Sequence, residues 1–375
     1  MMKDFFEAKS FHRIALVAAV VLVLGLAACG GGGDESNNNA CVSGGSGASE
    51  SAPYIICTAK DLADLADRVN TGTESSDMYY QLGRNIDLSA YKSSKGWIPI
   101  GITYWFTGNF DGNGKTVTNL FIDDDSSIDP AGLFGRIDDG GTVKNLGIEG
   151  ADITGGSLYV GGVAGRVGVG SSGSVSNCYV TGKVSGEQTV GGVAGHVGSG
   201  GSVSDCYVTG KVSGEQIVGG VVGNVGSGGS VINCYATGKV SGENFVGGVA
   251  GSVVYGGSVT GCAALNPEIE RNSGANTTFG RVAGSTSTLV NNVALSDMTP
   301  PGGIVFAGTA SNKDGANITK GEAKTQTTYS GAPRNWAFSG GDPKWKWGGA
   351  SYPLPVLYWQ TGAQIPAALP DHLLP

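Results

Sequence analysis

A segment of about 28 residues recurs through the middle of the chain, and this repeat constrains the fold more than any other feature. Its opening motif, VGGVAG or VGGVVG, begins at Val160, Val190, Val218 and Val246. Residues 190–217 and 218–245 are identical at 21 of their 28 positions. A period of this length is typical of a solenoid, in which each unit stacks on the next.

Within each copy, short runs of Val, Thr and Tyr alternate with turns of Gly and Ser, a pattern typical of strands rather than helices. In CYVTGKV (residues 206–212), Cys206 and Val208 alternate with Tyr207 and Thr209, which predicts one buried and one exposed strand face. The sequence therefore predicts an all-β fold, a right-handed parallel β-helix or β-solenoid of about 28 residues per coil. We expect three strands per coil, separated by corners where glycine permits a positive φ or a close approach of neighbouring coils.

Less regular copies of the pattern flank the repeats, so we assign the solenoid to residues 97–295. AGLFGRIDDGGTVKNLGIEG, at residues 131–150, precedes the repeats, and TFGRVAGSTSTLVNNVAL follows them from Thr278. The open ends of a solenoid leave strands unpaired and need caps. In the predicted N-terminal cap, residues 52–96, Thr58 is a suitable N-cap for a short capping helix with one apolar face.

The last part of the chain, residues 296–375, is predicted to cap the other end of the solenoid. It contains four tryptophans between residues 336 and 359, which are more typical of a packed cap than of a ligand pocket. A Pro-rich tail follows Gln364, and we expect this tail to be disordered.

The N-terminus has the pattern of an export signal followed by a flexible linker. Basic residues up to Arg13 precede an apolar run over residues 14–28, which is short for a membrane span. We assign residues 1–28 to a signal peptide. Residues 29–51 have few apolar side chains to bury, so we predict a flexible linker rich in Gly, Ser and Asn.

The end of this signal, Leu26-Ala27-Ala28-Cys29, resembles the lipobox of bacterial lipoproteins. The resemblance implies that Cys29 is the lipid attachment site and the first residue of the mature chain, held at a membrane by its acyl chains. Gly30 occupies the position where an Asp marks inner-membrane retention in enteric bacteria, so the resemblance favours a bacterial outer membrane lipoprotein. The alternative is an ordinary secretory signal in which the Cys occurs by chance.

The glycine-rich cores resemble those of the GLUG-motif repeat proteins, bacterial surface proteins named for a small Gly-hydrophobic-Gly signature. Gly132-Leu133-Phe134-Gly135 and the VGGVAG cores carry this likeness, together with the Gly-Ser/Thr-Val turn and the CYVTGKVSG-like strand that follow each core. The resemblance covers roughly residues 53–295. It implies a β-solenoid in a cell-surface setting, such as an adhesin or an accessory region of a secreted protease, and it implies no catalytic residues.

The outward face of the CYVTGKV strands is our candidate ligand-binding surface. Tyr, Thr and Lys recur there in register, which predicts aromatic rings, hydroxyls and cations on one flat surface. Such a surface is suitable for an extracellular glycan or for a host or matrix protein. The alternative is that the tyrosines stack only because strand surfaces favour aromatic pairs. The candidate residues are Tyr179, Tyr207, Tyr235, Thr181, Thr209, Thr237, Lys183, Lys211 and Lys239.

Carboxylates and one histidine are the candidates for catalysis or metal binding. Glu187, Glu215 and Glu243 recur in register, but they lack the differing environments that acid–base catalysis requires. His196 is replaced by Arg or Asn in the neighbouring copies, and we interpret it as a solvated residue. We therefore assign no catalytic residue, metal site or cofactor. Acidic turns offer oxygen ligands for a structural calcium ion, although ordinary surface turns explain them as well. These acids are Asp123, Asp124, Asp125, Asp129, Asp138 and Asp139.

Cysteine recurs with the repeat and is predicted to form a column inside the solenoid. Neighbouring parallel side chains point the same way, which makes the torsion of a disulfide awkward, so we expect free buried thiols. Cys41 and Cys57 are a separate pair that is able to form a disulfide. The repeated cysteines are Cys178, Cys206, Cys234 and Cys262.

The net charge and the identity between repeats narrow the range of functions that the chain is suited to. The net charge is −8, and it becomes −9 without residues 1–28, which hold three basic and two acidic side chains. Such a surface disfavours nucleic acid as a partner. The leading hypothesis is a lipid-anchored, non-enzymatic solenoid for cell-surface adhesion or for binding a glycan or a protein. The alternatives are a polysaccharide-degrading lyase or glycoside hydrolase of the β-helix type and a structural surface spacer.

Overall fold

The computed structural model describes most of the chain after its first 40 residues. The described ranges are 41–74, 76–124, 128–156, 158–198, 200–226, 228–276, 278–285 and 288–374. The predicted signal peptide, Cys29 and Asp125 lie outside the described residues. Among the described residues, no helix combines the length and the apolar character that a membrane crossing requires.

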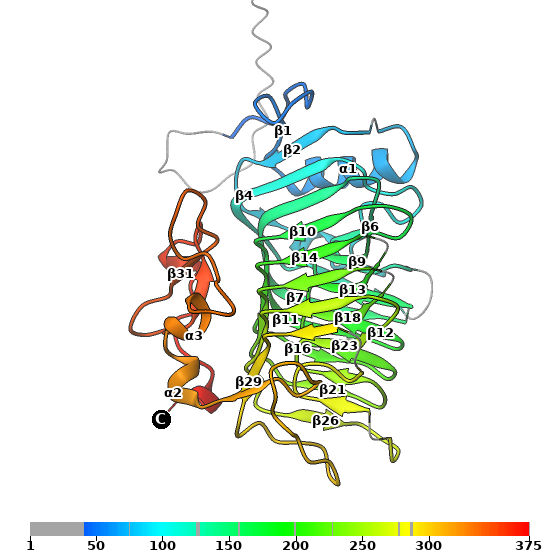
Figure 1. The fold of residues 1–375 in the computed structure, drawn as a ribbon. Coiled ribbons are helices and arrows are strands. Elements are labelled where there is room, and N and C mark those ends of the chain that lie inside the picture. The colour runs from blue at the N-terminus through cyan, green and yellow to red at the C-terminus, as the bar shows by residue number, and fades with distance from the viewer. Residues whose placement is uncertain are drawn as a thin grey trace, which may run out of the picture. The chain divides into compact units, whose positions relative to one another are not determined.

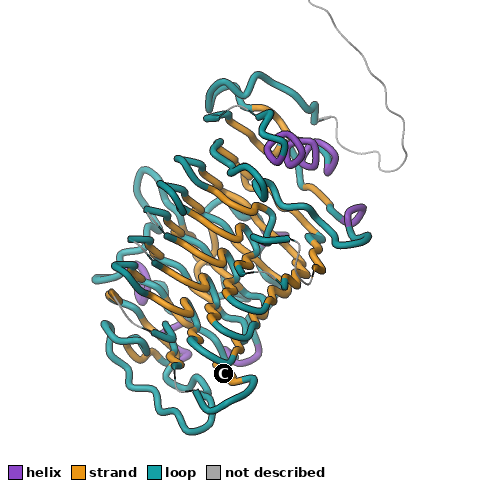
Figure 2. Tube along the Cα trace, turned by 90° about the vertical axis from the view of Figure 1, so that its right-hand side faces the viewer, coloured by secondary structure: helices purple, strands orange, loops and turns teal. Residues whose placement is uncertain are grey.

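Short parallel strands stack coil upon coil and form a β-solenoid (Figure 1; Figure 2). Over the described residues, the coils have three walls: one sheet of 20 strands and two sheets of five strands each. The predicted all-β solenoid is therefore confirmed. One regular coil consists of β12 (Thr189–Gly191), β13 (Ala194–Val197), β14 (Ser202–Ser204), β15 (Tyr207–Val208) and β16 (Lys211–Ser213).

The large wall is interrupted by turns, so this regular coil has five short strands where three were predicted. Asp205 lies between β14 and β15 with a φ of 51°, which takes the chain out of the extended conformation. Asn and Asp tolerate this left-handed conformation better than other residues that carry a side chain, so glycine does not occupy every corner. The corresponding residues in other coils are Asn145, Asn177, Asn233 and Asn291, all with positive φ.

The large wall contains three columns of parallel strands. The first column stacks β1 (Tyr54–Ile56), β2 (Tyr79–Leu82), β4 (Asn109–Thr118), β7 (Thr142–Gly155), β10 (Ser174–Ser176), β14, β19 (Ser230–Ile232), β24 (Ser258–Thr260) and β28 (Thr288–Val290). The second stacks β3 (Ile86–Asp87), β4, β7, β11 (Tyr179–Gly186), β15, β20 (Tyr235–Ala236), β25 (Ala263–Ala264), β29 (Val293–Leu295) and β30 (Ala316–Ile318). The third stacks β5 (Phe121–Asp124), β7, β11, β16, β21 (Val240–Gly242) and β26 (Ile269–Arg271).

The other two walls complete each coil. One stacks β8 (Tyr159–Gly161), β12, β17 (Ile217–Gly219), β22 (Val246–Gly247) and β27 (Phe279–Gly280). The other stacks β6 (Phe134–Ile137), β9 (Ala164–Val167), β13, β18 (Val222–Val225) and β23 (Ala250–Val253). The VGGVAG cores connect these two walls, one core in each regular coil.

Identical residues pair across neighbouring coils, as the 28-residue period predicts. Val190 pairs with Val218, and Val203 pairs with Val231. All four side chains are buried. Because full burial of one valine contributes ~1.5–3 kcal/mol, the stacked valine columns are a large part of what stabilises the solenoid.

The parallel stacking extends beyond the predicted boundaries of residues 97–295. β1 pairs with β2 before Trp97, and β29 pairs with β30, which ends at Ile318. The sequence did not indicate these coils because their strands have only two to four residues and lack the VGGVAG core.

The predicted N-terminal helix is confirmed as α1 (Ala59–Asn70). The hydroxyl of Thr58 accepts a hydrogen bond from the backbone N–H of Asp61, and the Asp61 carboxylate accepts one from the N–H of Thr58. The Asn70 side chain then joins the helix to the first coils by donating to the carbonyl of Pro99 at 2.9 Å. A short 3-10 helix, η1 (Ser89–Tyr91), follows. The buried face of α1 consists of Leu62, Leu65, Ala66 and Val69.

A disulfide between Cys41 and Cys57 attaches the start of the described chain to the solenoid. Gly44 and Ile55 also exchange two backbone hydrogen bonds, of 3.0 and 2.7 Å. The prediction of a flexible linker over residues 29–51 is therefore wrong for residues 41–51. The disulfide and the backbone hydrogen bonds to Ile55 hold this part of the chain in place.

The repeated cysteines are free and buried, as predicted. The backbone N–H of each donates to the sulfur of the next at 3.4 Å, and in the last coil Asn292 replaces the thiol as acceptor for Cys262. Burial raises the pKa of Cys206, Cys234 and Cys262, so these thiols stay protonated. The column therefore has a structural role.

The C-terminal part of the chain does not simply cap the solenoid. Residues 299–315 do contact the last coil, since the carbonyl of Lys313 accepts the N–H groups of Val282 and Ala283 at 2.9 Å. The chain then turns back along the large wall, and we call residues 320–374 the return segment (Figure 1). It contains α2 (Lys320–Ala323), α3 (Thr327–Ser330), β31 (Trp345–Trp347), β32 (Pro355–Leu357), η2 (Gly362–Gln364) and η3 (Asp371–Leu373).

The Pro-rich tail after Gln364 is ordered, contrary to our expectation. Leu373 is buried, and its carbonyl accepts a hydrogen bond from Lys324 at 3.0 Å. A ring nitrogen of His372 lies 2.7 Å from the carbonyl of Leu265. These contacts hold the tail against both the return segment and the wall.

Candidate functional site

The tyrosine column predicted as a ligand-binding surface is buried. Tyr179, Tyr207 and Tyr235 stack with ring centroids 5.2 and 5.0 Å apart, and each side chain is 1% exposed or less. The prediction that they form an exposed surface is therefore wrong. The physical reason is that tryptophans of the return segment cover them. The ring centroid of Trp359 lies 5.6 Å from that of Tyr179, and the ring centroid of Trp345 lies 5.9 Å from that of Tyr235.

Three indole N–H groups fix the return segment to the left-handed corners of the wall. Trp359 donates to the carbonyl of Asn177 at 3.1 Å, Trp345 to the carboxylate of Asp205 at 3.0 Å, and Trp336 to the carbonyl of Gly261 at 2.7 Å. Buried Trp side chains need such partners. The return segment therefore matches the spacing of the coils.

The tyrosine hydroxyls take part in the same contact. Gln360 donates to the hydroxyl of Tyr207 at 2.8 Å, and the hydroxyl of Tyr235 donates to the carbonyl of Pro355 at 2.7 Å. Burial raises the pKa of both tyrosines far above its ordinary value. The hydroxyls therefore remain neutral and serve packing rather than acid–base chemistry.

Asp205 replaces an Asn of neighbouring coils, and burial raises its pKa. A folded pKa above the unfolded value means that stability increases as pH falls through the folded pKa, and that this gain is absent at neutral pH. We expect Asp205→Asn, which keeps an acceptor for Trp345, to raise the melting midpoint near neutral pH, because the amide carries no charge that burial would penalise. Thermal melts of both proteins between acidic and neutral pH measure this, and a lower midpoint for the variant at neutral pH contradicts it.

The threonine and lysine columns do not form one exposed surface either. Thr237 is buried, whereas Thr181 and Thr209 are half-buried. Lys183 and Lys211 are exposed and pair in register. In the last coil that carries the repeated tyrosine, Lys239 forms ion pairs of 2.7 and 2.8 Å with Glu268 and Glu270 of the following coil. The structure thus aligns the nine predicted residues on the large wall and leaves mainly two lysines accessible.

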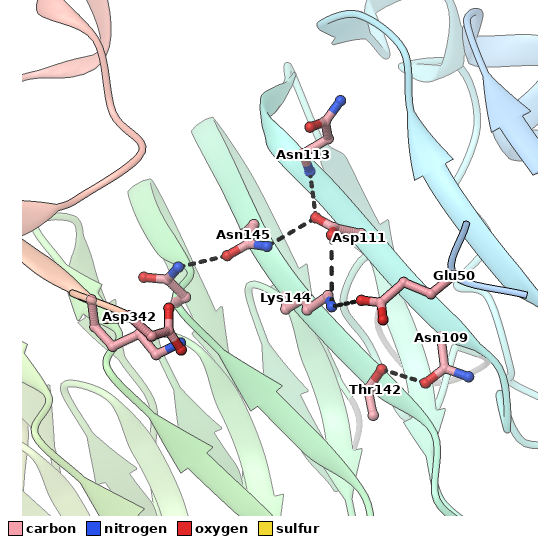
Figure 3. Close-up of polar contacts among 10 residues, drawn as sticks. Glu50, Asn109, Asp111, Asn113, Thr142, Lys144, Asn145 and Asp342 are labelled. Atoms are coloured by element: carbon pink, nitrogen blue, oxygen red, sulfur yellow. Dashed lines mark hydrogen bonds and ion pairs between the residues drawn. The ribbon is translucent and has the colours of Figure 1, made fainter. Parts of the chain in front are cut away.

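A polar groove on the N-terminal half of the large wall is the candidate functional site, and we call it the Asp111 groove (Figure 3). It consists of two adjoining cavities of about 300 and 510 Å³ that share Asp111. The first lies between the wall and the N-terminal loop that carries Glu50. The second lies between the wall and the return segment. The residues that line the second cavity include Asn85, Asn113, Lys115, Asn145, Asn177, Asp342, Tyr358, Trp359 and Gln364.

Hydrogen bonds position the side chains around Asp111 (Figure 3). One carboxylate oxygen accepts from the backbone N–H of Asn113 at 2.7 Å and from the Asn145 amide at 3.0 Å. The oxygen of that amide in turn accepts from Asn177 at 2.5 Å. Donors and acceptors are therefore held in fixed directions along the wall, as a preformed site requires.

A single cation balances the acids in the first cavity. Lys144 lies 2.7 Å from a carboxylate oxygen of Glu50 and 3.8 Å from one of Asp111. Its hydrogen bond to Glu50 raises the pKa of Lys144, and the same bond lowers the pKa of Glu50. Both groups are thus held in their charged forms at neutral pH, and neither is poised to exchange a proton.

The return segment supplies the opposite side of the second cavity. Tyr358 is 53% exposed and presents its ring to solvent beside the half-buried Trp359. Gln364 closes this side by donating to the carbonyl of Gly114 at 2.9 Å. Sequence reasoning missed these residues because they lie about 250 positions away from Asp111 in the chain.

The other predicted chemistry is not assembled among the described residues. No group of three or more His, Cys, Asp or Glu side chains there is arranged to hold a metal ion. Asp138 is buried and accepts backbone N–H groups of Val169, Gly170 and Ser171 at 2.8–3.1 Å. Asp124 forms an ion pair of 3.0 Å with Lys95.

The structure also places the repeated glutamates and His196. The backbone N–H of Glu215 donates to the carbonyl of Glu187 at 3.0 Å, so these glutamates lie at equivalent turn positions of successive coils. His196 is half-buried, and the interpretation of it as a solvated residue is wrong. Its ring packs 5.4 Å from that of Tyr159.

Comparison with known proteins identifies the repeat. The profile of the GLUG motif matches residues 156–185, 186–213 and 214–241. The chain carries GLUG-motif repeats. These repeats include the tyrosine column, whereas Asp111 precedes them.

Two relatives share the GLUG repeats over part of their length. Halomucin of Haloquadratum walsbyi is 39% identical over 160 residues, which are 40% of this chain and 2% of that protein. A protein of Evansella cellulosilytica, provisionally named a Gly-rich membrane protein, is 38% identical over 117 residues, 30% of this chain and 12% of that protein. The chain thus spans only a small fraction of either relative.

The fold of the GLUG solenoid has a counterpart among solved structures. A Bacteroides ovatus protein, provisionally named an immunoglobulin A1 protease, superposes with a TM-score of 0.66 at 23% sequence identity. The alignment covers 84% of this chain and 94% of that chain. At this identity the likeness shows the fold alone.

Proposed function

We propose that this GLUG-repeat solenoid is a cell-surface binding protein whose Asp111 groove binds an oligosaccharide without cleaving it. The observation that carries the proposal is the second cavity, whose lining combines fixed amide and carboxylate groups with the exposed Tyr358. Sugars present hydroxyls that pair with such polar groups and apolar ring faces that stack on aromatic side chains. This groove replaces the buried tyrosine column as the candidate binding surface.

The proposed location at the cell surface is supported by resemblance and by the names of relatives. The names Halomucin and Gly-rich membrane protein belong to proteins that share the repeat. We propose further that lipid on Cys29 anchors the chain to the bacterial outer membrane. Mass spectrometry of the mature protein tests this: we expect an N-terminal diacylated Cys29 and its loss in Cys29→Ala, whereas an unmodified mature N-terminus overturns the proposal.

Binding is tested by retention of the purified chain on an array of polysaccharides. We expect Tyr358→Ala and Asp111→Asn each to weaken binding about tenfold, because each removes one of the two kinds of contact that the groove offers a sugar. Lys211→Ala is the matched control, since this lysine is exposed on the same wall outside the cavity linings.

The same experiment separates the alternative functions. Retention without released oligosaccharide supports a binding protein. Release of oligosaccharide into the supernatant favours the polysaccharide-degrading enzyme instead. Retention that is equal in all variants excludes the Asp111 groove as the site, and the absence of any retention favours a structural spacer.

A further inference from the structure

A column of basic and polar side chains lies on β6, β9, β13 and β18. These strands form a different wall from the one that carries the Asp111 groove (Figure 1). Arg136 pairs with Arg166, Arg166 with His196, and His196 with Asn224 in the parallel register. Adjacent strands are ~4.8 Å apart, so these side chains are close neighbours. Each is half-buried, and the next residue along each strand is buried, which places this column on the outer side of the wall.

The column contains buried polar atoms that have no partner among the described residues. Nε of Arg136, Nε of Arg166, Nδ1 of His196 and Oδ1 of Asn224 are buried without a hydrogen bond. Neither arginine has an ion pair with a described carboxylate within 4 Å; Arg166 has the ring of Tyr159 4.5 Å from its guanidinium carbon. Unpaired buried polar atoms are costly, and four of them in successive coils need an explanation.

Another arginine of this protein shows how the fold normally satisfies such a group. Arg281 also leaves its Nε unpaired, but both of its Nη atoms donate. The acceptors are the carbonyls of Leu295 and Gly315, each at 3.0 Å, and the side chain of Asn317 at 2.7 Å. Arg136 and Arg166 have no such set of acceptors within the described residues, so their donors remain available.

The charges in the column repel one another and attract an anion. Burial lowers the pKa of Arg166, and Arg136 lowers it further. Burial, with Arg166, lowers the pKa of His196 to about 4, although the neighbouring Asn224 side chain acts to raise it. Tyr159, Asp129 and Asp138 raise the pKa of Arg166. The carboxylate of Asp138 is occupied by backbone N–H groups, and Asp129 forms no ion pair within 4 Å with either arginine among the described residues. An additional negative charge would offset the repulsion that remains.

We propose that Arg136, Arg166 and His196 form a binding site for one oxyanion, a sulfate or a carboxylate group such as an acidic sugar carries. Two guanidinium groups on adjacent strands offer planar pairs of N–H donors, and these match the oxygen pairs of sulfate and carboxylate. The imidazole extends the site by one coil. Because the site lies on a different wall from the Asp111 groove, it stands or falls independently of the proposed function.

The test titrates the full chain with sodium sulfate at constant ionic strength and follows the ring resonances of His196 by NMR. We expect saturable shifts and a His196 pKa above its anion-free value. Arg136→Gln should weaken sulfate binding at least tenfold, because this residue lies two strands away from the histidine, with β9 between them, and contributes only its own donors. Lys211→Gln, which removes an exposed cation from another wall, should leave the binding unchanged.

Further probes distinguish the source of the anion. Galacturonic acid should compete with sulfate if an acidic sugar is the ligand, whereas competition by acetate and not by galacturonic acid indicates a site for small free ions. Neutral galactose should have no effect. If Arg136→Gln does not fold, Arg166→Lys takes its place, because it keeps the charge but loses the planar donor pair and should also weaken sulfate binding. Linear shifts without saturation, or equal affinity in Arg136→Gln and the unmodified chain, overturn the proposal.

Discussion

Replacement of Trp345 by alanine is expected to lower the free energy of unfolding by about 3–5 kcal/mol. The indole ring is completely buried and lies 4.6 Å from Trp336 and 5.9 Å from Tyr235. The substitution leaves a cavity between the return segment and the wall. It also removes the indole N–H that donates a hydrogen bond to Asp205. Equilibrium urea unfolding, followed by tryptophan fluorescence and circular dichroism, measures the loss.

Tyr358→Ala is the control for this substitution, because it removes an exposed aromatic ring from the same segment. We expect it to change stability by less than about 1 kcal/mol. A loss below about 1 kcal/mol for Trp345→Ala would contradict the packing of the return segment against the tyrosine column.

The second large effect is expected for Gly220→Ala, in the VGGVVG core. A Cβ at this position would lie 2.1 Å from the carbonyl oxygen of Gly248 in the next coil. The coils must move apart to accept the methyl group, and overpacking of this kind costs about 1–3 kcal/mol or more. The entropy that alanine removes from the unfolded chain offsets at most about 1 kcal/mol. Thermal unfolding and the yield of soluble protein report the result.

Gly170→Ala is the matched control, since the nearest atoms to its new Cβ would be 3.6 Å away, in ordinary contact. We expect its melting temperature to stay near that of the unmodified protein. Equal stability of the two variants would mean that the second glycine of the core is not required for coil spacing. The same reasoning applies to the equivalent glycines Gly162, Gly192 and Gly248. A Cβ added at any of them would lie 2.4–2.5 Å from a carbonyl oxygen of the next coil.

The repeat predicted the solenoid well because its information is local and periodic. The alternation around Cys206 placed the thiols inside, and the 28-residue step placed identical valines opposite each other. Residues 54–87 and 316–318 escaped prediction because they join the stack through backbone pairing, which does not depend on a repeated core. Backbone pairing leaves little trace in composition.

The site was harder to predict for a different physical reason. Strand alternation correctly placed Tyr207 on the outer side of the wall, but it contains no information about what covers that side. The cover comes from Trp345 and Trp359, which lie far along the chain. Their apolar rings could pack equally well against the end of the solenoid or against the side of its large wall. The Asp111 groove exists only because this cover and the wall meet there, so a single strand could not reveal it.

The return segment also affects how the coils unfold and when the solenoid is fully covered during synthesis. In an ordinary solenoid each coil touches only its neighbours, and such an array can lose its terminal coils one at a time. Here one stretch of chain links Gly114 in an early coil, through Gln364, with Gly261 in a late coil, through Trp336. Loss of an end coil must therefore strain contacts along several others, which favours all-or-none unfolding. During synthesis the aromatic column made by the middle coils remains uncovered until residues 336–359 emerge.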